Sequence, residues 1–227
     1  MTDEASSWAR GRWGRAGGWV ATVLAVAFAA TLALTSRAAG TGPEPRLLPV
    51  PLISQATPWT CGAASLMAAL VYFGVFDEPE SRLDAELGAT PENGVEPERI
   101  AAEARRYSLD AEVRTGMKLT DLADELARGS LVIVALQAWP SDPSSDPETG
   151  WEDGHYVVVV GLDERRVYAM DPSVRTGYAY LTRDAFVRRW HDYDVVGGRR
   201  RAYERLGVVL RGPRAMPRYP AEPTPIE

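Results

Sequence analysis

The sequence predicts an α+β domain in which helices come first and an antiparallel β-sheet follows. Before residue 130, apolar residues recur at helical spacing in stretches rich in alanine and glutamate. After that point, short apolar runs are separated by polar turns. A run of helices followed by a run of strands is typical of α+β folds, whereas a regular alternation of the two would indicate a parallel sheet.

Four helices are expected in the first half of the domain, over residues 60–73, 79–87, 96–107 and 119–127. The first begins at about Thr60 and ends before Gly74, a residue type that commonly stops a helix. The third is rich in Glu, Ala and Arg, which favour helices. The fourth is expected to have its cap near Thr120, with Gly129 behind its end.

Four strands are expected after these helices, over residues 131–137, 156–162, 166–170 and 206–210. Only polar residues separate the second and third of them, which is the pattern of a β-hairpin. A fifth helix is expected over residues 183–190, before the last strand.

An uncharged, apolar run of 18 residues, from residue 17 to residue 34, precedes the folded domain. As a helix it would be about 27 Å long, close to the roughly 30 Å hydrocarbon core of a bilayer. Three arginines between residues 10 and 15 stand in front of it, so the positive-inside rule keeps the amino terminus in the cytoplasm. A cleaved signal peptide is the alternative, with the secreted chain beginning at Ala39 or Gly40.

The chain is therefore predicted to have five parts. They are a cytoplasmic segment (1–16), a transmembrane signal-anchor (17–35), a linker (36–46), a globular domain (47–211) and a disordered proline-rich tail (212–227). The predicted location is the cell membrane, with the globular domain on the extracytoplasmic side.

Charge and residue counts exclude several kinds of function. The net charge is −6, and an acidic domain is a poor partner for nucleic acid, whose binding depends on neutralising phosphates. A single cysteine excludes an internal disulfide framework. One cysteine and two histidines are too few for a zinc site, so neither a metal nor an organic cofactor is expected. The oligomeric state is left open.

Cys61 falls in the first turn of the first predicted helix, in the stretch PWTCGAAS. The N–H groups and the positive dipole end of a helix N-terminus favour a thiolate over a thiol. Gly62, Ala63 and Ala64 leave space around the sulfur for a substrate. A small buried cysteine is the alternative interpretation, because a lone cysteine often has only a packing role.

His155 and Asp171 are predicted to meet at one end of the sheet. His155 opens the strand over 156–162 and Asp171 follows the strand over 166–170, so an antiparallel pairing brings the two residues close. The imidazole can then accept a proton from a thiol and return it to a leaving amine, while the carboxylate holds its tautomer. Taken singly, the two residues can also be a structural histidine and a turn aspartate.

Three further features receive different interpretations. Gln55, six residues before Cys61, can supply an amide N–H to an oxyanion hole. His191 follows a predicted helix and no apolar strand, and is interpreted as structural. The acidic loop over residues 141–153 matches no cation-binding pattern and is interpreted as a solvated lid beside the site.

The combined order of these residues resembles that of one enzyme family. The order is Gln-x5-Cys-Gly, then Gly-His before an apolar strand, then Asp-Pro after the next strand. It resembles the order in the papain-like cysteine peptidases of the bacteriocin-processing, double-glycine leader family. The resemblance covers residues 50–210. It implies a papain-like fold in which a nucleophile at a helix N-terminus packs on an antiparallel sheet. It also implies a nucleophile, a base, an orienting carboxylate and an oxyanion-hole donor, which are Cys61, His155, Asp171 and Gln55.

The function expected from this resemblance is a membrane-anchored, extracytoplasmic cysteine peptidase that acts on a peptide or a protein. The chain is expected to be a stand-alone member, without the ABC transporter that follows the leader-processing peptidases, so a leader peptide is not implied as its substrate. Two other functions are compatible with the same residues. One is a thiol amidase or transpeptidase that acts on cell-wall peptides, and the other is a catalytically silent binding module.

Overall fold

The computed structural model describes residues 45–76, 80–91 and 93–213. The predicted cytoplasmic segment, the signal-anchor, most of the linker and nearly all of the predicted tail lie outside these residues. Among the described residues, no helix is long and apolar enough to cross a bilayer.

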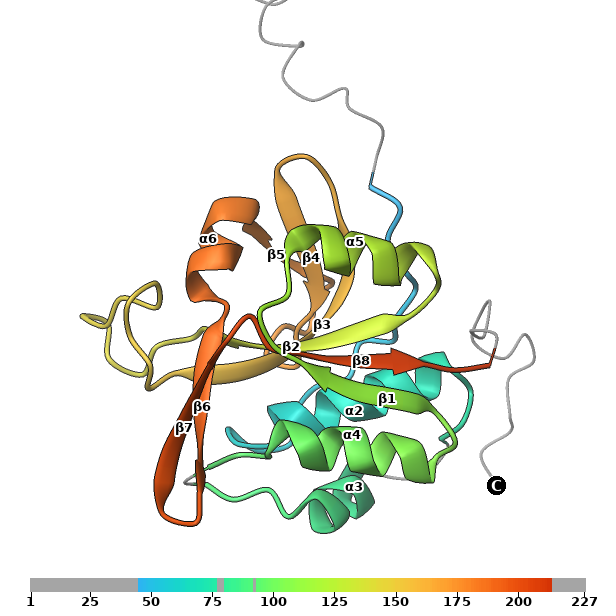
Figure 1. Ribbon diagram of the computed structural model, residues 1–227, viewed down its shortest axis with the longest axis horizontal. Helices are drawn as coiled ribbons and strands as arrows, with labels where there is room; N and C mark the ends of the chain where they lie inside the picture. The colour runs from blue at the N-terminus through green and yellow to red at the C-terminus, as the bar shows by residue number, and fades with distance from the viewer. Residues whose placement is uncertain (1–44, 77–79, 92, 214–227) are drawn as a thin grey trace, which may run out of the picture. The chain divides into compact units, whose positions relative to one another are not determined.

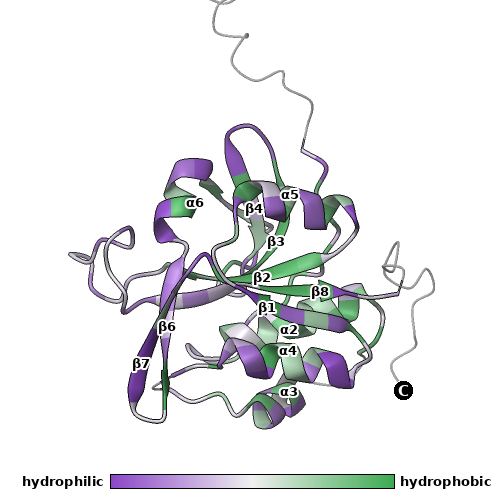
Figure 2. Cartoon of the chain, in the orientation of Figure 1, coloured by the Kyte–Doolittle hydropathy of each residue, from purple (hydrophilic) through white to green (hydrophobic). Residues whose placement is uncertain are grey.

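Six antiparallel strands form the main sheet, in the order β1-β8-β2-β3-β4-β5 (Figure 1). They are β1 (Asp110–Arg114), β2 (Leu131–Gln137), β3 (Gly154–Leu162), β4 (Arg166–Met170), β5 (Ala179–Thr182) and β8 (Gly207–Arg211). β2 is buried along its whole length and β3 along nearly all of it. Strands covered on both faces read as continuous apolar runs, and Figure 2 shows β2 and β8 as hydrophobic ribbons at the centre of the fold.

Helices cover both faces of this sheet. α2 (Cys61–Tyr72), α3 (Glu80–Leu87) and α4 (Pro97–Arg106) pack on one face, and α5 (Leu119–Ala127) and α6 (Arg183–Arg189) pack on the other. Successive side chains of a strand point to opposite faces, so Ile133 of β2 belongs to the first core while Val132 and Val134 belong to the second. The sheet therefore separates two hydrophobic cores.

α2 is the most deeply buried helix and fixes the position of Cys61. Ten of its 12 residues are buried, and its small side chains permit close packing. A Cβ atom at Gly62 would lie only 3.3 Å from Ile100, Tyr156 and Val95. The Ser65 hydroxyl donates a hydrogen bond to the backbone carbonyl of Tyr156 (3.2 Å). The start of α2 is thus held directly against β3, the strand that carries His155.

A two-stranded hairpin stands apart from the main sheet. It consists of β6 (His191–Val196) and β7 (Arg199–Glu204), joined by Gly197 and Gly198, both of which have positive φ angles. Glycine adopts this backbone conformation without the steric cost that other residues incur. The β6–β7 hairpin is largely hydrophilic in Figure 2.

The predicted α+β class is confirmed, and every predicted helix and strand is present with its ends within two residues. Four strands were not predicted: β1, β5, β6 and β7. They are short or rich in charged residues and lack the continuous apolar run that indicates a strand in a sequence. The predicted cap near Thr120 is wrong. The N-cap of α5 is Lys118, whose backbone N–H donates to the carboxylate of Asp121 (2.7 Å).

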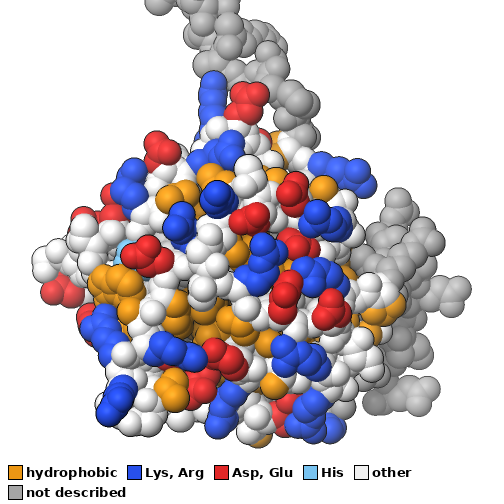
Figure 3. All heavy atoms as spheres, in the orientation of Figure 1, with side chains coloured by type: hydrophobic (Ala, Val, Ile, Leu, Met, Phe, Trp, Pro, Cys, Tyr) orange, Lys and Arg blue, Asp and Glu red, His pale blue; other side chains and the backbone are white. Residues whose placement is uncertain are grey.

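Charged residues of both signs are interspersed on the face of the domain shown in Figure 3. Blue and red side chains alternate there, with smaller hydrophobic areas between them. That face lacks the continuous basic stripe by which proteins commonly track nucleic-acid phosphates.

Candidate active site

Cys61 is the first residue of α2, and its side chain is almost fully buried. The turn before it is closed by Thr60, whose hydroxyl accepts a hydrogen bond from the backbone N–H of Thr57 (3.0 Å). No side chain caps the helix. The N–H groups of the first turn are therefore not occupied by a capping residue, and they point toward the end of the helix where the sulfur lies.

His155 lies between a carboxylate and the cysteine. It is the second residue of β3, it is 5% exposed, and its Nε2 atom is 2.8 Å from Oδ1 of Asp171. Its side chain also interacts electrostatically with the side chain of Cys61. Because Nε2 is used by the carboxylate, the other ring nitrogen, Nδ1, remains for the sulfur.

Asp171 directly follows β4 and is held in place by three donors. Besides His155, the backbone N–H of Ser173 donates to Oδ1 (2.8 Å) and the indole N–H of Trp139 donates to Oδ2 (3.0 Å). The antiparallel register that pairs Val158 with Met170 brings the start of β3 beside the end of β4. The local hairpin therefore explains why His155 and Asp171 meet.

The two groups shift each other's protonation. Burial by itself lowers the pKa of His155, but its hydrogen bonds and charge interactions with Asp171 and Cys61 outweigh burial and raise the pKa to about 9. Burial by itself raises the pKa of Asp171, but the bond and charge of His155, together with the N–H donors of Ser173 and Trp139, outweigh burial and lower it. At neutral pH the site therefore favours a protonated imidazole bound to an ionised carboxylate.

Gln55 lies beside the loop that follows Asp171. Its backbone N–H donates to the carbonyl of Pro172 (3.1 Å), and its side-chain oxygen accepts from the hydroxyl of Ser173 (3.2 Å). Its amide nitrogen donates to the carbonyl of Thr57 (2.9 Å), in the turn that leads into Cys61. One of the two amide N–H bonds is used in this way, which leaves the second for another acceptor.

Trp139 is a residue of the site that sequence reasoning missed. It has a φ angle of 58°, which is unusual for a bulky residue, and its side chain is 58% exposed although it bonds to a buried carboxylate. Strained backbone of this kind persists only where the surrounding structure enforces it. Nothing in the sequence distinguishes this tryptophan from an ordinary loop residue, because its partner is 32 residues away.

A cleft of about 250 Å³ opens beside the sulfur, and we call it the Cys61 cleft. Its walls come from the turn before α2, residues 93–95, the end of the acidic loop and both strands of the β6–β7 hairpin. Its lining includes Trp151, Glu152, Gly154, Asp192, Tyr193 and Asp194. The cleft therefore combines aromatic rings with carboxylates, and the unpredicted hairpin supplies much of it.

His191 fastens the acidic loop to the hairpin. Its Nε2 atom is 2.7 Å from the carbonyl oxygen of Gly150, and its ring packs on Trp151 with 4.5 Å between ring centres. Arg188 of α6 also forms a two-bond ion pair with Glu148. These contacts agree with the structural role predicted for His191. The loop predicted as a lid lies beside the cleft, which Trp151 and Glu152 help to line. It is held in place by the bonds of Gly150 to His191 and of Glu148 to Arg188.

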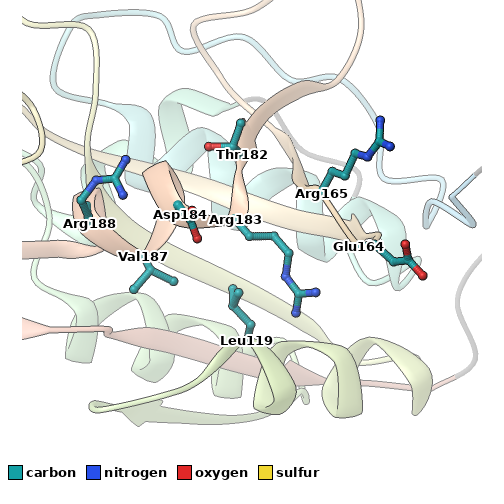
Figure 4. A pocket seen from close by; sticks show the side chains of 8 residues that line it. All are labelled: Leu119, Glu164, Arg165, Thr182, Arg183, Asp184, Val187 and Arg188. Atoms are coloured by element: carbon teal, nitrogen blue, oxygen red, sulfur yellow. The ribbon is translucent and has the colours of Figure 1, made fainter. Parts of the chain in front are cut away.

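A larger hollow of about 640 Å³ lies elsewhere, where the β3–β4 turn meets the first turns of α5 and α6 (Figure 4). Arg183 extends toward Leu119, and Arg165 and Glu164 lie at one side. Neither the cysteine nor either residue of the His155–Asp171 pair lines it. Within the described residues, no group of three or more His, Cys, Asp or Glu side chains is arranged to hold a metal ion.

Comparison with known proteins identifies relatives of this fold. The model of the Peptidase_C39 like family matches residues 47–196. None of the curated proteins matches the sequence. A solved C39-like peptidase from Bacillus anthracis is 20% identical with a TM-score of 0.54, covering 76% of this chain and 100% of that one.

Two transporter-linked peptidases have similar structures. The peptidase domain of Streptococcus ComA, a bi-functional ABC transporter involved in quorum sensing, is 17% identical with a TM-score of 0.52, covering 72% of this chain and 99% of that one. A double glycine motif protease from an AMS/PCAT transporter, solved in complex with the leader peptide, is 19% identical with a TM-score of 0.50. The match covers 74% of this chain and 94% of that one. At these identities the structural likeness concerns the fold.

Proposed function

The chain belongs to the Peptidase_C39 like family and is a cysteine peptidase, and from this premise we propose that it hydrolyses peptide bonds with Cys61, His155 and Asp171 as a catalytic triad. The observation that carries the proposal is the position of His155, whose Nε2 lies 2.8 Å from Asp171 and whose side chain interacts electrostatically with Cys61. A nucleophile, a base and an orienting group in this order are the parts that acyl transfer requires.

In the proposed reaction, Cys61 attacks the carbonyl carbon of the scissile bond as a thiolate. The N–H groups of the first turn of α2 and the second amide N–H of Gln55 stabilise the oxyanion. His155, protonated in the resting site, gives its proton to the leaving amine, and a thioester with Cys61 remains. The neutral imidazole then accepts a proton from water, which attacks the thioester and releases the carboxylic acid and the thiolate.

Asp171 and Trp139 act through His155 in this proposal. Asp171 holds the Nε2–H tautomer, so that Nδ1 faces the sulfur, and its charge favours the imidazolium. Trp139 holds the second oxygen of that carboxylate and thereby limits its rotation. We class Trp139 as a positioning residue, because it contacts neither Cys61 nor the imidazole in any described bond.

A peptide is the proposed substrate, bound in the Cys61 cleft. One relative of this fold was solved with a leader peptide, and the cleft beside Cys61 is lined by residues from several loops, as a peptide site requires. The run of 18 uncharged residues from residue 17 supports the further proposal that the domain is tethered to the membrane and works on its extracytoplasmic side.

The test is product identification from a complex peptide mixture. The purified full-length protein is incubated with peptides derived from a proteome, and new termini are identified by mass spectrometry, with Cys61→Ala as the control. We expect new free carboxyl and amino termini that depend on Cys61. Addition of an amine nucleophile separates the alternatives: incorporation of the amine in place of hydrolysis would identify a transpeptidase, and the absence of any Cys61-dependent product would overturn the proposed function.

A further inference from the structure

Asp192 presents a buried carboxylate to the Cys61 cleft. It is the second residue of β6 and only 7% exposed, and yet it lines the cleft. Its Oδ1 atom accepts hydrogen bonds from the backbone N–H of Tyr193 (2.8 Å) and from the side-chain amide of Gln137 (3.2 Å). Within the described part of the chain, no bond to its Oδ2 atom is formed. One oxygen of a nearly buried carboxylate is thus left to the cleft.

The neighbouring carboxylates already have cations. Arg201 of β7 donates to Asp194 and to Glu98. Arg200 lies 3.7 Å from Glu152. Asp192 has no ion pair with a described Arg or Lys, although it lines the Cys61 cleft and is nearly as buried as Asp194, which has one. When Asp192 is ionised, the charge of Arg200 opposes its own, but no direct ion pair with a described residue neutralises it.

Asp192 also lies against the residue next to the base. A Cβ atom at Gly154 would collide with both oxygens of the Asp192 carboxylate, and Gly154 immediately precedes His155. Glycine is required there for the carboxylate to approach the backbone so closely. The carboxylate consequently lies against the backbone of the residue that precedes the base.

The aromatic walls of the same cleft suit a cation. The guanidinium of Arg200 lies 3.6 Å from the ring centre of Tyr193 and 5.6 Å from that of Trp151. Faces of tyrosine and tryptophan attract cations because of their ring quadrupoles. Arg200 shows that two aromatic rings lining the cleft accommodate a guanidinium, whereas Asp192 forms no direct ion pair with a described residue.

Burial makes the ionised form of Asp192 costly. Loss of solvent, reinforced by the charge of Asp194, raises the pKa of Asp192 to about 7, against the opposing effects of the Tyr193 N–H, Gln137 and Arg200. A ligand cation would remove that cost, because it would pair with the carboxylate on binding.

We propose that Asp192 forms a subsite for a cationic group of the substrate, which is either a lysine or arginine side chain near the scissile bond or the free α-amino group of a short peptide. This subsite rests on the proposed peptidase function, because it specifies which class of peptide the enzyme would bind in the Cys61 cleft. Its structural basis is the free oxygen of a 93% buried carboxylate, beside the nucleophile and between aromatic walls.

The first experiment measures charge at the cleft without any peptide cleavage. Cys61 is modified with 2-aminoethyl methanethiosulfonate, which is cationic, and with 2-hydroxyethyl methanethiosulfonate, which is neutral, at pH 8. We expect the ratio of the two rate constants to fall about 5-fold in Asp192→Asn, the effect of one carboxylate a few ångströms from the reagent's charge in a partly solvated site. Asp124→Asn, which removes an exposed charge on α5, should leave the ratio unchanged.

The second experiment uses internally quenched peptides in which each position around the scissile bond carries lysine, arginine, glutamine or norleucine. We expect at least a 10-fold preference in kcat/KM for a cation at one position, reduced to near unity in Asp192→Asn and retained in Asp124→Asn. Comparison of N-acetylated peptides with the same peptides bearing a free amino terminus separates a side-chain cation from an α-amino group.

The outcomes are distinguishable. Cleavage without a cationic preference, or a preference that survives in Asp192→Asn, would overturn the subsite while leaving the peptidase proposal intact. If no peptide is cleaved, the peptidase proposal fails, but the rates of Cys61 modification still test the subsite. An equal ratio of the cationic to the neutral rate constant in wild type and Asp192→Asn would overturn the subsite.

Discussion

The imidazole of His155 has a partner on each side, and its position depends on residues that do no chemistry themselves. Asp171 holds one ring nitrogen, while Ser173 and Trp139 hold Asp171. A histidine in this arrangement can be both the proton donor and the proton acceptor of the two half-reactions. The residue-scale predictions follow from this chain of bonds.

Substitution of His155 should be the most damaging change after substitution of Cys61. We expect His155→Ala to lower kcat/KM by at least 1000-fold, because within the described residues no other base contacts the sulfur. Asp171→Asn should retain more activity than Asp171→Ala, since asparagine still offers an acceptor to the Nε2–H. Peptidase rates of the three variants check this order, and full activity in His155→Ala would contradict the triad.

The alkaline side of the pH–rate profile should report His155. The pKa of His155 is raised from 6.5 to about 9 in the folded protein, so folding stabilises the protonated imidazole. The resulting contribution to the free energy of unfolding is complete below pH 6.5 and is lost as the pH rises through 9. We expect kcat/KM to fall with a midpoint near pH 9. In Asp171→Asn the midpoint should move to lower pH, because the carboxylate that raises the pKa is gone. An unchanged midpoint would show that Asp171 does not set the protonation of His155.

Trp139→Phe tests a positioning role. The variant keeps an aromatic ring in the loop but removes the indole N–H that donates to Asp171 (3.0 Å). We expect kcat to fall about 10- to 100-fold with little change in KM, and the alkaline midpoint to shift, because a hydrogen bond to a charged group contributes roughly 1.5–3 kcal/mol. A loss of thermal stability without a change in kcat or in the pH profile would instead indicate a purely structural role.

At the scale of elements, the site is built where two helices and a hairpin meet the ends of β3 and β4. α2 brings Cys61 to the sheet, and α6 positions the start of β6. Trp190, which ends α6, donates its indole N–H to the carbonyl of Leu206 (2.8 Å) and packs against Phe186 with 5.0 Å between ring centres. The second hydrophobic core therefore supports the hairpin that lines the Cys61 cleft.

Phe186→Ala should reveal how strongly this support contributes to stability. The side chain is 1% exposed and belongs to the core between α6 and the sheet. We expect the free energy of unfolding to fall by about 3–5 kcal/mol, the usual cost of removing a buried aromatic ring. Val187→Ala, at a neighbouring position that is 42% exposed, should cost less than about 1 kcal/mol. Chemical denaturation of both variants measures the difference, and equal effects would contradict the packing of Phe186 in the second core.

At the scale of the whole molecule, the chain combines a catalytic domain with an apolar amino-terminal run. The domain forms its own two cores from residues 45–76, 80–91 and 93–213. The run from residue 17 to residue 34 has the length and the flanking arginines of a signal-anchor.

The full-length protein should therefore remain in the membrane fraction. We expect it to resist extraction by high salt and by alkaline carbonate and to be released by detergent, because a transmembrane helix is held by burial of apolar surface and not by charge. Protease added outside intact cells should digest the catalytic domain. A mature protein whose amino terminus is Ala39, found in the soluble exported fraction, would contradict the anchor and identify a cleaved signal peptide.

The sequence by itself determined the features that depend on neighbouring residues. Helices with apolar spacing and strands with continuous apolar runs were predicted to within two residues, and Cys61 was correctly placed at a helix start. The meeting of His155 and Asp171 was predictable because a short polar turn joins their strands, so the register of one hairpin decides their distance.

Only the tertiary structure decided which distant residues meet. His155 and Cys61 are brought together by the packing of α2 on β3, Trp139 reaches Asp171 from another loop, and Asp192 enters the cleft on a hairpin whose strands carry no apolar run. Such contacts depend on the order of strands in the sheet, in which the last strand, β8, lies between β1 and β2. Local propensity does not specify that order, because it results from burying two cores at once across many residues of sequence separation.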